Sequence, residues 1–212
     1  MPVLDNKYAI ALHTSTPQLG IALSNYAGDS RNQTWDLGRG LASQLHQYLG
    51  EILSPQTWSD LAFIAVAKGP GGFTGTRVGV VTARTLAQQL NIPLFGISNL
   101  AAIAAQQADY SGAELLLAIQ MAARREELFV GIYQMTSHGL QTYMPDTLIN
   151  QPNWQQTLDK LSRPYKLITA SENIASSVVE VLDLGYNLWQ QGLQPSWSET
   201  VPYYGQHPVN NP

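Results

Sequence analysis

A strand, a glycine-rich loop, a helix and a second strand follow one another in the first half of the chain, and this order constrains the fold most strongly. Residues 61–67 form a continuous apolar run, which is typical of a strand buried on both faces. The loop at residues 69–72 ends this run, and a helix is predicted from there to about Leu90. Residues 93–97 form a second short apolar run. A strand–helix–strand order of this kind predicts a parallel pair of strands in one sheet.

Three short strands and a helix are predicted ahead of this unit. Residues 8–12, 19–23 and 33–37 are apolar or alternate between apolar and polar, and turn residues separate them, which predicts an antiparallel meander. A helix is expected next, because apolar residues recur at helical spacing. These residues are Leu41, Leu45, Tyr48, Leu49 and Ile52.

A similar series is predicted from residue 115 onward. It comprises strands at 115–119, 128–133 and 140–148, a helix at 154–161, a strand at 165–170 and a helix from Ser171 to about Leu182. We therefore expect an α/β chain with two related halves, residues 1–100 and residues 101–212. The tail from Gly185 has no clear pattern, and one option is that it packs back on the first half.

The charge of the chain argues against a protein that binds RNA by itself. The net charge is −4 and the eleven Lys and Arg residues are scattered, whereas such proteins usually carry a basic patch. The chain has no cysteine, so disulfides and thiolate metal sites are excluded. It shows no signal peptide at Met1–Asn6 and no apolar stretch of about 20 residues. We therefore expect a cytoplasmic protein without a membrane partner.

The loop between the buried strand and the helix is a candidate site for an anion or a nucleotide. Glycines permit positive φ and close approach of another group, and the N–H groups of a helix N-terminus suit a phosphate. Thr74 is expected to cap the helix. The candidate residues are Gly69, Gly71, Gly72, Thr74 and Arg77. The alternative is a tight strand-to-helix turn without a ligand, since the loop lacks the Lys-Ser/Thr pair of a Walker A loop.

The helix behind the loop carries a stripe of very small side chains. Gly75, Gly79, Ala83 and Ala87 recur every four residues. Such a stripe lets another backbone approach unusually closely. The approaching backbone belongs either to another element of the same domain or to another subunit, and the sequence leaves both readings open.

Several segments together resemble the TsaB (YeaZ) family. They are Thr14–Thr16, residues 69–77 with the helix that follows, residues 92–100, Ala123-Arg124 with Glu127–Phe129, and Pro202–Tyr204. The resemblance is strong over about residues 7–134 and weak beyond. The stretch from Lys68 to Leu100 is long and specific, which argues against chance.

The resemblance implies an actin-like (ASKHA) fold with two ribonuclease-H-like mixed-sheet halves. It implies a non-catalytic subunit that binds and supports a TsaD-like transferase, which adds a threonylcarbamoyl group to the adenosine next to the tRNA anticodon. A TsaE-like ATPase joins this assembly, and we expect the chain to form a homodimer when it is alone. We expect no cofactor of its own, so that any ATP and magnesium would belong to the complex.

The resemblance also implies that the two N-terminal helices form the partner surface. The expected interface residues are Leu41, Leu45, Tyr48, Leu49, Ile52, Gly75, Val78, Gly79, Ala83 and Ala87. The stripe of small residues would then receive the partner's backbone.

Two departures from the family pattern bear on nucleotide binding. His13 and Ala122 stand where the family usually carries aspartates, and hard cations such as magnesium require oxygen ligands. The four histidines are also too far apart in sequence to suggest a metal motif. We therefore expect no catalytic residue and no metal site. The alternative function is an actin-like nucleotide-binding phosphotransferase or ATPase that uses residues 69–77.

Overall fold

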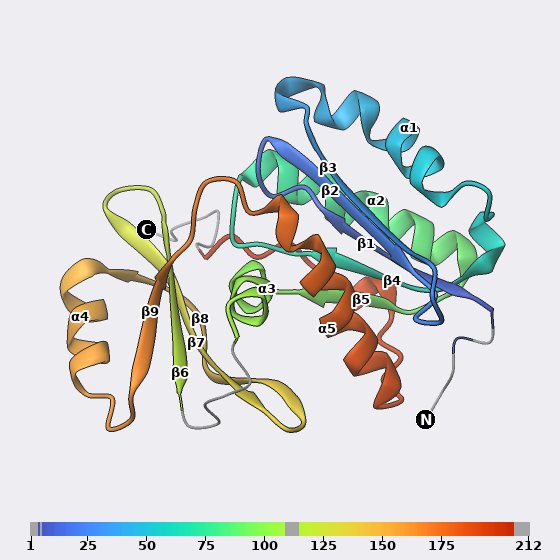
Figure 1. Cartoon of the computed structure of the whole chain (residues 1–212). Coiled ribbons are helices and arrows are strands. Elements are labelled where there is room, and N and C mark those ends of the chain that lie inside the picture. The colour runs from blue at the N-terminus through green and yellow to red at the C-terminus, as the bar shows by residue number, and fades with distance from the viewer. Residues whose placement is uncertain (1–3, 5, 109–114, 206–212) are drawn as a thin grey trace. The chain divides into compact units, whose positions relative to one another are not determined.

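The computed structural model describes residue 4, residues 6–108 and residues 115–205, which fall into two compact units (Figure 1). The first unit holds the described chain up to Asn99 together with Asn173–Tyr203, and the second holds Leu100–Glu172 with Tyr204 and Gly205. The sequence-based division at residue 100 therefore differs in one respect, because residues 173–203 pack with the first unit. None of the helices within the described ranges has the length and apolar character of a membrane span.

The first unit is built on a five-stranded mixed sheet in the order β3-β2-β1-β4-β5. Its strands are β1 (Tyr8–His13), β2 (Gln18–Ser24), β3 (Ser30–Asp36), β4 (Leu61–Ala67) and β5 (Leu94–Ile97). Strands β1, β2 and β3 pair antiparallel, whereas β4 pairs parallel with both β1 and β5. The predicted meander and the predicted parallel pair are therefore confirmed.

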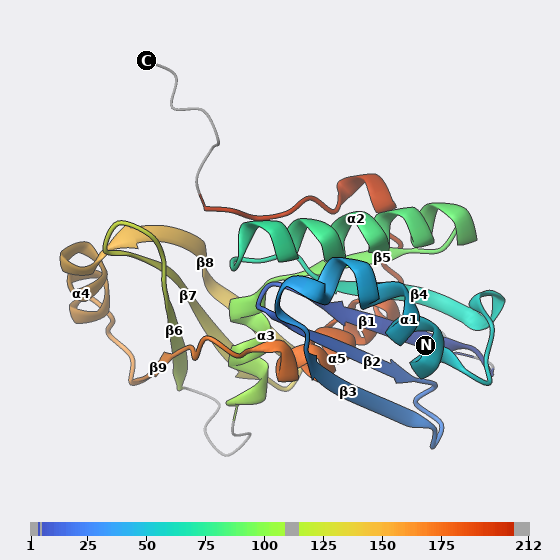
Figure 2. The same ribbon diagram turned by 90° about the horizontal axis from the view of Figure 1, so that it is seen from above.

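Helices cover both faces of this sheet (Figure 1 and Figure 2). Helices α1 (Leu41–Leu53) and α2 (Phe73–Leu90) pack on one face, with strand residues such as Ile10 and Ile64. Helix α5 (Val178–Gln190) packs on the other face, where a Cβ added to its Gly185 would lie 2.9 Å from the Cβ of Ala65. Successive residues of the strands therefore pack alternately against the helices on the two faces of the sheet.

Helix α5 begins and ends later than the sequence predicts. It follows the short 3-10 helix η3 (Ala175–Ser177) and runs through Gly185 to Gln190, whereas the pattern predicts a helix from Ser171 to about Leu182. The glycine is tolerated because its missing side chain lets the helix lie close to the sheet. This packing offsets the cost of about 1 kcal/mol that glycine carries in a helix.

The second unit is built on a four-stranded mixed sheet in the order β8-β7-β6-β9. Its strands are β6 (Leu116–Ala122), β7 (Glu127–Thr136), β8 (Gly139–Asn150) and β9 (Tyr165–Thr169), and its helix is α4 (Gln151–Asp159). Trp154 of α4 is fully buried against this sheet, and its Nε1–H donates to Oε1 of Gln120 at 2.8 Å. The remaining elements are α3 (Asn99–Gln106), η1 (Gly38–Gly40), η2 (Trp58–Asp60) and η4 (Trp197–Glu199).

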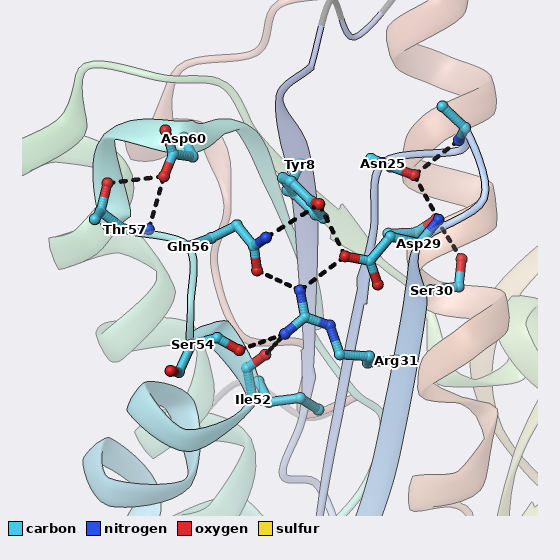
Figure 3. A network of polar contacts seen from close by, with 12 residues as sticks. Tyr8, Asn25, Asp29, Ser30, Arg31, Ile52, Ser54, Gln56, Thr57 and Asp60 are labelled. Carbon is cyan, nitrogen blue, oxygen red and sulfur yellow. Dashed lines mark hydrogen bonds and ion pairs between the residues drawn. The ribbon is translucent and has the colours of Figure 1, made fainter.

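A polar network fixes the C-terminal end of α1 to the meander (Figure 3). Arg31 of β3 donates to the carbonyl oxygens of Ile52, at 3.1 Å, and Ser54, and it pairs with Asp29 at 3.1 Å. Gln56 also accepts from this guanidinium. A cation at the C-terminus of a helix satisfies carbonyls that have no partner within the helix. The network therefore holds α1 at a defined place on the sheet.

Candidate functional site

The glycine loop before α2 is tied to the start of α3 by hydrogen bonds. The N–H of Asn99 donates to the carbonyl of Gly69 at 2.9 Å, and its Nδ2 donates to the carbonyl of Pro70 at 2.8 Å. Its Oδ1 in turn accepts from the N–H of Gly69 at 3.3 Å. Asn99 is fully buried, so its side chain acts as a fixed brace for the loop.

The glycines of the loop make room for other parts of the same chain. A Cβ added to Gly69 would come closer than 3.0 Å to the carbonyl oxygen of Tyr203, and one added to Gly71 would meet Ser15 at 2.7 Å. The N–H of Gly72 donates to the carbonyl of Ser15 at 2.7 Å. Gly69 also has φ +101°, which only glycine adopts easily. The close approaches that the sequence suggests are thus made by the protein itself.

The other two candidate anion-binding residues are not part of this packing. Helix α2 begins at Phe73 with Gly72 as its N-cap, so the prediction that Thr74 caps the helix is wrong. Thr74 and Arg77 are exposed in the first turns of α2. A glycine N-cap explains the difference, because glycine is accepted at this position without a side-chain bond.

The stripe of small residues on α2 packs inside the first unit. A Cβ on Gly75 or on Gly79 would come closer than 3.0 Å to Thr14, which follows β1. Thr14 Oγ1 donates to the carbonyl of Gly75 at 2.8 Å. Ala83 and Ala87 are fully buried in the core of the unit. The reading of the stripe as a surface that receives a partner's backbone is therefore wrong, since the chain's own turn occupies it.

The apolar stripe of α1 also faces inward. Leu41, Leu45, Leu49 and Ile52 are at most 8% exposed and pack on the sheet, which corrects their assignment to an interface. Tyr48 is half-buried, with its ring centroid 4.5 Å from that of Trp35. The physical reason is general, because an amphipathic helix in a layered α/β unit packs its apolar face against the sheet of the same unit.

The outward side of α2 keeps an apolar and cationic character. Phe73 is 49% exposed and Val81 is 53% exposed, and Arg77 lies between them on the same side of the helix. Val78 of the predicted set is half-buried. Helix α2 contains no Asp or Glu, so nothing on the helix itself balances its arginines. An exposed side of this kind is a candidate for contact with another protein.

His13 ends β1 as a buried, neutral side chain. It is fully buried, and neither ring nitrogen has a hydrogen-bond partner among the described residues. Burial lowers its pKa from 6.5 to about 4. Ser15 Oγ and Thr76 Oγ1 are likewise buried without partners in the described chain. A neutral imidazole cannot supply the carboxylate oxygen that magnesium prefers, so these residues do not fit a magnesium-linked phosphate.

The described residues also offer no alternative metal centre. They contain no group of three or more His, Asp or Glu side chains arranged to hold an ion. Ala122, at the end of β6, is exposed and has no polar atom in its side chain.

Comparison with known proteins shows the family to which this chain belongs. The model of the TsaD family, described as tRNA N6-adenosine threonylcarbamoyltransferase, matches residues 41–186. The chain belongs to the TsaD family, as a TsaB (YeaZ) member. Its relatives include "tRNA threonylcarbamoyladenosine biosynthesis protein TsaB" of Bacillus subtilis, 33% identical over 64% of this chain and 57% of that protein. The protein of the same name from Escherichia coli is 30% identical over 62% of this chain and 57% of that protein.

The fold of the family is matched over nearly the whole chain. The solved structure "YeaZ from Pseudomonas aeruginosa" superposes with a TM-score of 0.76 and 22% identity, covering 93% of this chain and 100% of that chain. The resemblance to TsaB (YeaZ) and the α/β class with two mixed-sheet halves are therefore confirmed. In sequence, the chain spans only somewhat more than half the length of the curated TsaB relatives it matches.

Sequence reasoning missed the residues that the TsaB-like fold leaves at the surface of α2. Val81 lies outside the stripe of small residues on α2. Trp197 lies in the tail after Gly185, for which the sequence predicts no structure. Trp197 is half-buried beside α2, where the Arg84 guanidinium lies 5.4 Å from its ring centroid. The helical period could have identified Val81, because it lies on the side of α2 away from Gly79 and Ala83.

Proposed function

We propose that the chain is a non-catalytic subunit that binds and supports a TsaD-like threonylcarbamoyl transferase acting on the adenosine next to the tRNA anticodon. Its relatives carry the name of the threonylcarbamoyladenosine biosynthesis protein TsaB, which supports a role in that pathway. The observation that carries the proposal is the outward side of α2, where Phe73 and Val81 are each about half exposed. We propose these exposed residues as the interface in place of the residues predicted from the sequence, most of which are buried.

The chemistry of this surface suits a protein partner. Burying apolar surface contributes about 25 cal/mol per Å², so covering the exposed side chains of Phe73 and Val81 favours association with a partner. Arg77 stands between them without a carboxylate partner among the described residues. A partner that matches this surface therefore has an apolar patch with Asp or Glu beside it.

A supporting rather than catalytic role fits the residues at the end of β1. His13 is neutral at physiological pH because burial lowers its pKa to about 4, and the described residues contain no group of three or more His, Asp or Glu side chains that could hold a metal ion. We propose that this subunit holds no nucleotide or magnesium of its own and that ATP and magnesium act elsewhere in the complex.

Two further partners belong to the same proposal. A TsaE-like ATPase would join the complex of this chain with its TsaD-like partner. Without that partner, the exposed side of α2 would be covered by a second copy, which gives a homodimer. Stand-alone binding of tRNA is not proposed, because the eleven Lys and Arg residues of this acidic chain form no basic run.

Replacing Val81 with glutamate tests the docking surface. We expect Val81→Glu to weaken binding to a TsaD-like protein from the same cell at least tenfold, because it places a carboxylate in an apolar contact that faces acidic groups. Affinity is measured by titration calorimetry. The matched control is Leu167→Glu, since Leu167 is 45% exposed but lies in the second unit. Equal affinities for wild type and Val81→Glu would show that the partner docks elsewhere.

The alternative function, a nucleotide phosphotransferase or ATPase, is favoured by one observation. Ser15 Oγ and Thr76 Oγ1 lie near the glycine loop and are buried without hydrogen-bond partners in the described chain, which is a feature of sites that bind polar ligands. We nevertheless expect no measurable heat when ATP and magnesium are titrated into the isolated chain, because His13 offers no oxygen ligand. Micromolar binding and turnover that disappear in Thr74→Ala would instead support the enzyme.

A further inference from the structure

The last described residues of the first unit form a segment that runs beside α2. We name residues 196–203 the C-terminal strap, which includes η4 (Trp197–Glu199). Figure 2 shows it lying along α2, from η4 toward the start of the helix. Trp197 lies against Arg84 near one end, and the N–H of Tyr203 donates to the carbonyl of Lys68, ahead of α2, at 2.7 Å.

The strap is held in place by specific contacts. Thr200 is 5% exposed, and its Oγ1 donates to the carbonyl of Leu94 in β5 at 3.2 Å. The N–H of Leu94 donates to the carbonyl of Pro195, just ahead of the strap, at 3.3 Å. Gly96 of β5 has no side chain where Thr200 lies, since a Cβ there would be 2.8 Å from Thr200 Cγ2. The strap is thus a fixed part of the surface on this side of the sheet.

One flank of α2 faces the strap. Arg84 identifies this flank, because it contacts Trp197. Arg77 is seven residues earlier and Phe73 eleven residues earlier, so helical periodicity places both on the same flank, nearer the start of α2. The strap reaches that end of the helix at Tyr203. Its one strongly exposed apolar side chain, Val201 at 57%, therefore lies near the end of α2 that carries Phe73 and Arg77.

The charges on this row of residues are unbalanced. The carboxylate of Glu199, the acid of the strap, accepts from the N–H of Ser196 at 2.8 Å and serves as a cap for η4. Among the described residues no carboxylate pairs with Arg77 or Arg84. A second copy of the chain would bring arginines toward arginines, so it should bind this surface more weakly than a partner whose Asp or Glu residues balance them, and it should cover the surface only when that partner is absent.

We propose that the C-terminal strap forms the second wall of the docking surface for the TsaD-like partner and that Val201 contacts this partner directly. The inference rests on the proposed function, because it assumes that α2 docks the same protein. We expect the partner to present an apolar ridge flanked by carboxylates. This ridge would contact the surface formed by α2 and the strap.

The test compares two exposed aliphatic residues of the first unit. We expect Val201→Asp to weaken binding to the TsaD-like protein at least tenfold in titration calorimetry, because it puts a carboxylate against an acidic, apolar partner. Leu193→Asp is the matched control, since Leu193 is 48% exposed but lies before the strap, and its affinity should stay within twofold of wild type. Melting temperatures within about 2 °C of wild type would show that the strap still packs.

The outcomes separate this inference from the function on which it rests. Loss of binding in Val81→Glu with wild-type binding in Val201→Asp would overturn the strap while leaving the α2 docking surface intact. Wild-type binding in both variants, or no binding by the unaltered chain, would count against the proposed function itself. If Val201→Asp abolished only self-association in gel filtration, the strap would face a second copy and the inference would be wrong.

Discussion

Gly79→Ala is expected to destabilise the protein by about 2 kcal/mol, although alanine is the better helix former. Alanine in place of glycine inside a helix contributes about 1 kcal/mol of stability. Here the added methyl group would come closer than 3.0 Å to Thr14, whose hydroxyl already donates to Gly75 at 2.8 Å. Overpacking costs about 1–3 kcal/mol and the disturbed hydrogen bond costs about 1 kcal/mol more. Gly79→Leu, with a larger side chain, should cost more.

A second glycine provides the control for this experiment. Gly50 lies in α1, is exposed, and a Cβ there would meet nothing within 4 Å. Gly50→Ala should therefore stabilise the protein by up to about 1 kcal/mol. Urea unfolding followed by circular dichroism measures both variants. If Gly79→Ala were as stable as Gly50→Ala, the stripe would not pack on the chain's own turn.

A double-mutant cycle assigns the cost to one contact. Thr14→Ala removes the hydroxyl group with which the Cβ of an alanine at position 79 would clash. We expect Gly79→Ala to cost less in the Thr14→Ala background than in wild type, because residues in direct contact show coupling of about 0.5–3 kcal/mol. Identical costs in both backgrounds would place the strain elsewhere.

Replacing His13 with leucine is expected to stabilise the protein, and more strongly as the pH falls. The imidazole is buried without a hydrogen-bond partner among the described residues, which costs about 1–3 kcal/mol. Leucine fills a similar volume without a polar atom. At pH 7 the variant should therefore be more stable than wild type by about 1 kcal/mol or more.

The dependence on pH follows from the lowered pKa of His13. Its pKa is about 4 in the folded protein and 6.5 without burial, so the unfolded chain binds the proton more readily between these values. The free energy of unfolding of the wild type therefore falls as the pH drops from about 6.5 to about 4. At about 1.4 kcal/mol per pH unit, the full loss is about 3 kcal/mol.

Unfolding curves at pH 7, 5.5 and 4.5 check this behaviour in wild type and His13→Leu. The comparison is needed because burial raises the pKa values of Glu180 and Asp183. A raised carboxyl pKa favours the folded state at low pH and acts in the opposite direction. The difference in stability between the two proteins should widen as the pH falls. A constant difference would mean that His13 is not held neutral by burial.

The order and pairing of the elements could be predicted from the sequence because they depend on local pattern. The alternating residues of β2 and the continuous apolar run of β4 predict the two strands, and β2 is buried almost throughout because α1 packs on one of its faces and the start of α5 on the other. The end of α5 could not be predicted in this way. Gly185 usually marks a stop, and only its contact with the sheet makes it part of a helix.

The close packing against α2 was predictable from the sequence, but the element that packs there was not. The sequence identified α1 and α2, and the small side chains of Gly75 and Gly79 correctly predicted a close backbone approach. It could not tell which backbone approaches, since Thr14 is 61 residues away from Gly75 in the chain. A stripe of small residues looks the same whether it serves the domain core or a partner, and tertiary contacts decide.

The transfer assay with purified components tests the role of the chain most directly. Threonylcarbamoylated tRNA is measured with the TsaD-like protein, its ATPase, ATP and magnesium, either without this chain, with the wild-type chain, or with Val81→Glu. We expect modified tRNA to accumulate with the wild-type chain and to fall at least tenfold without it or with Val81→Glu. Equal modification in all three reactions would contradict a supporting subunit that docks through α2.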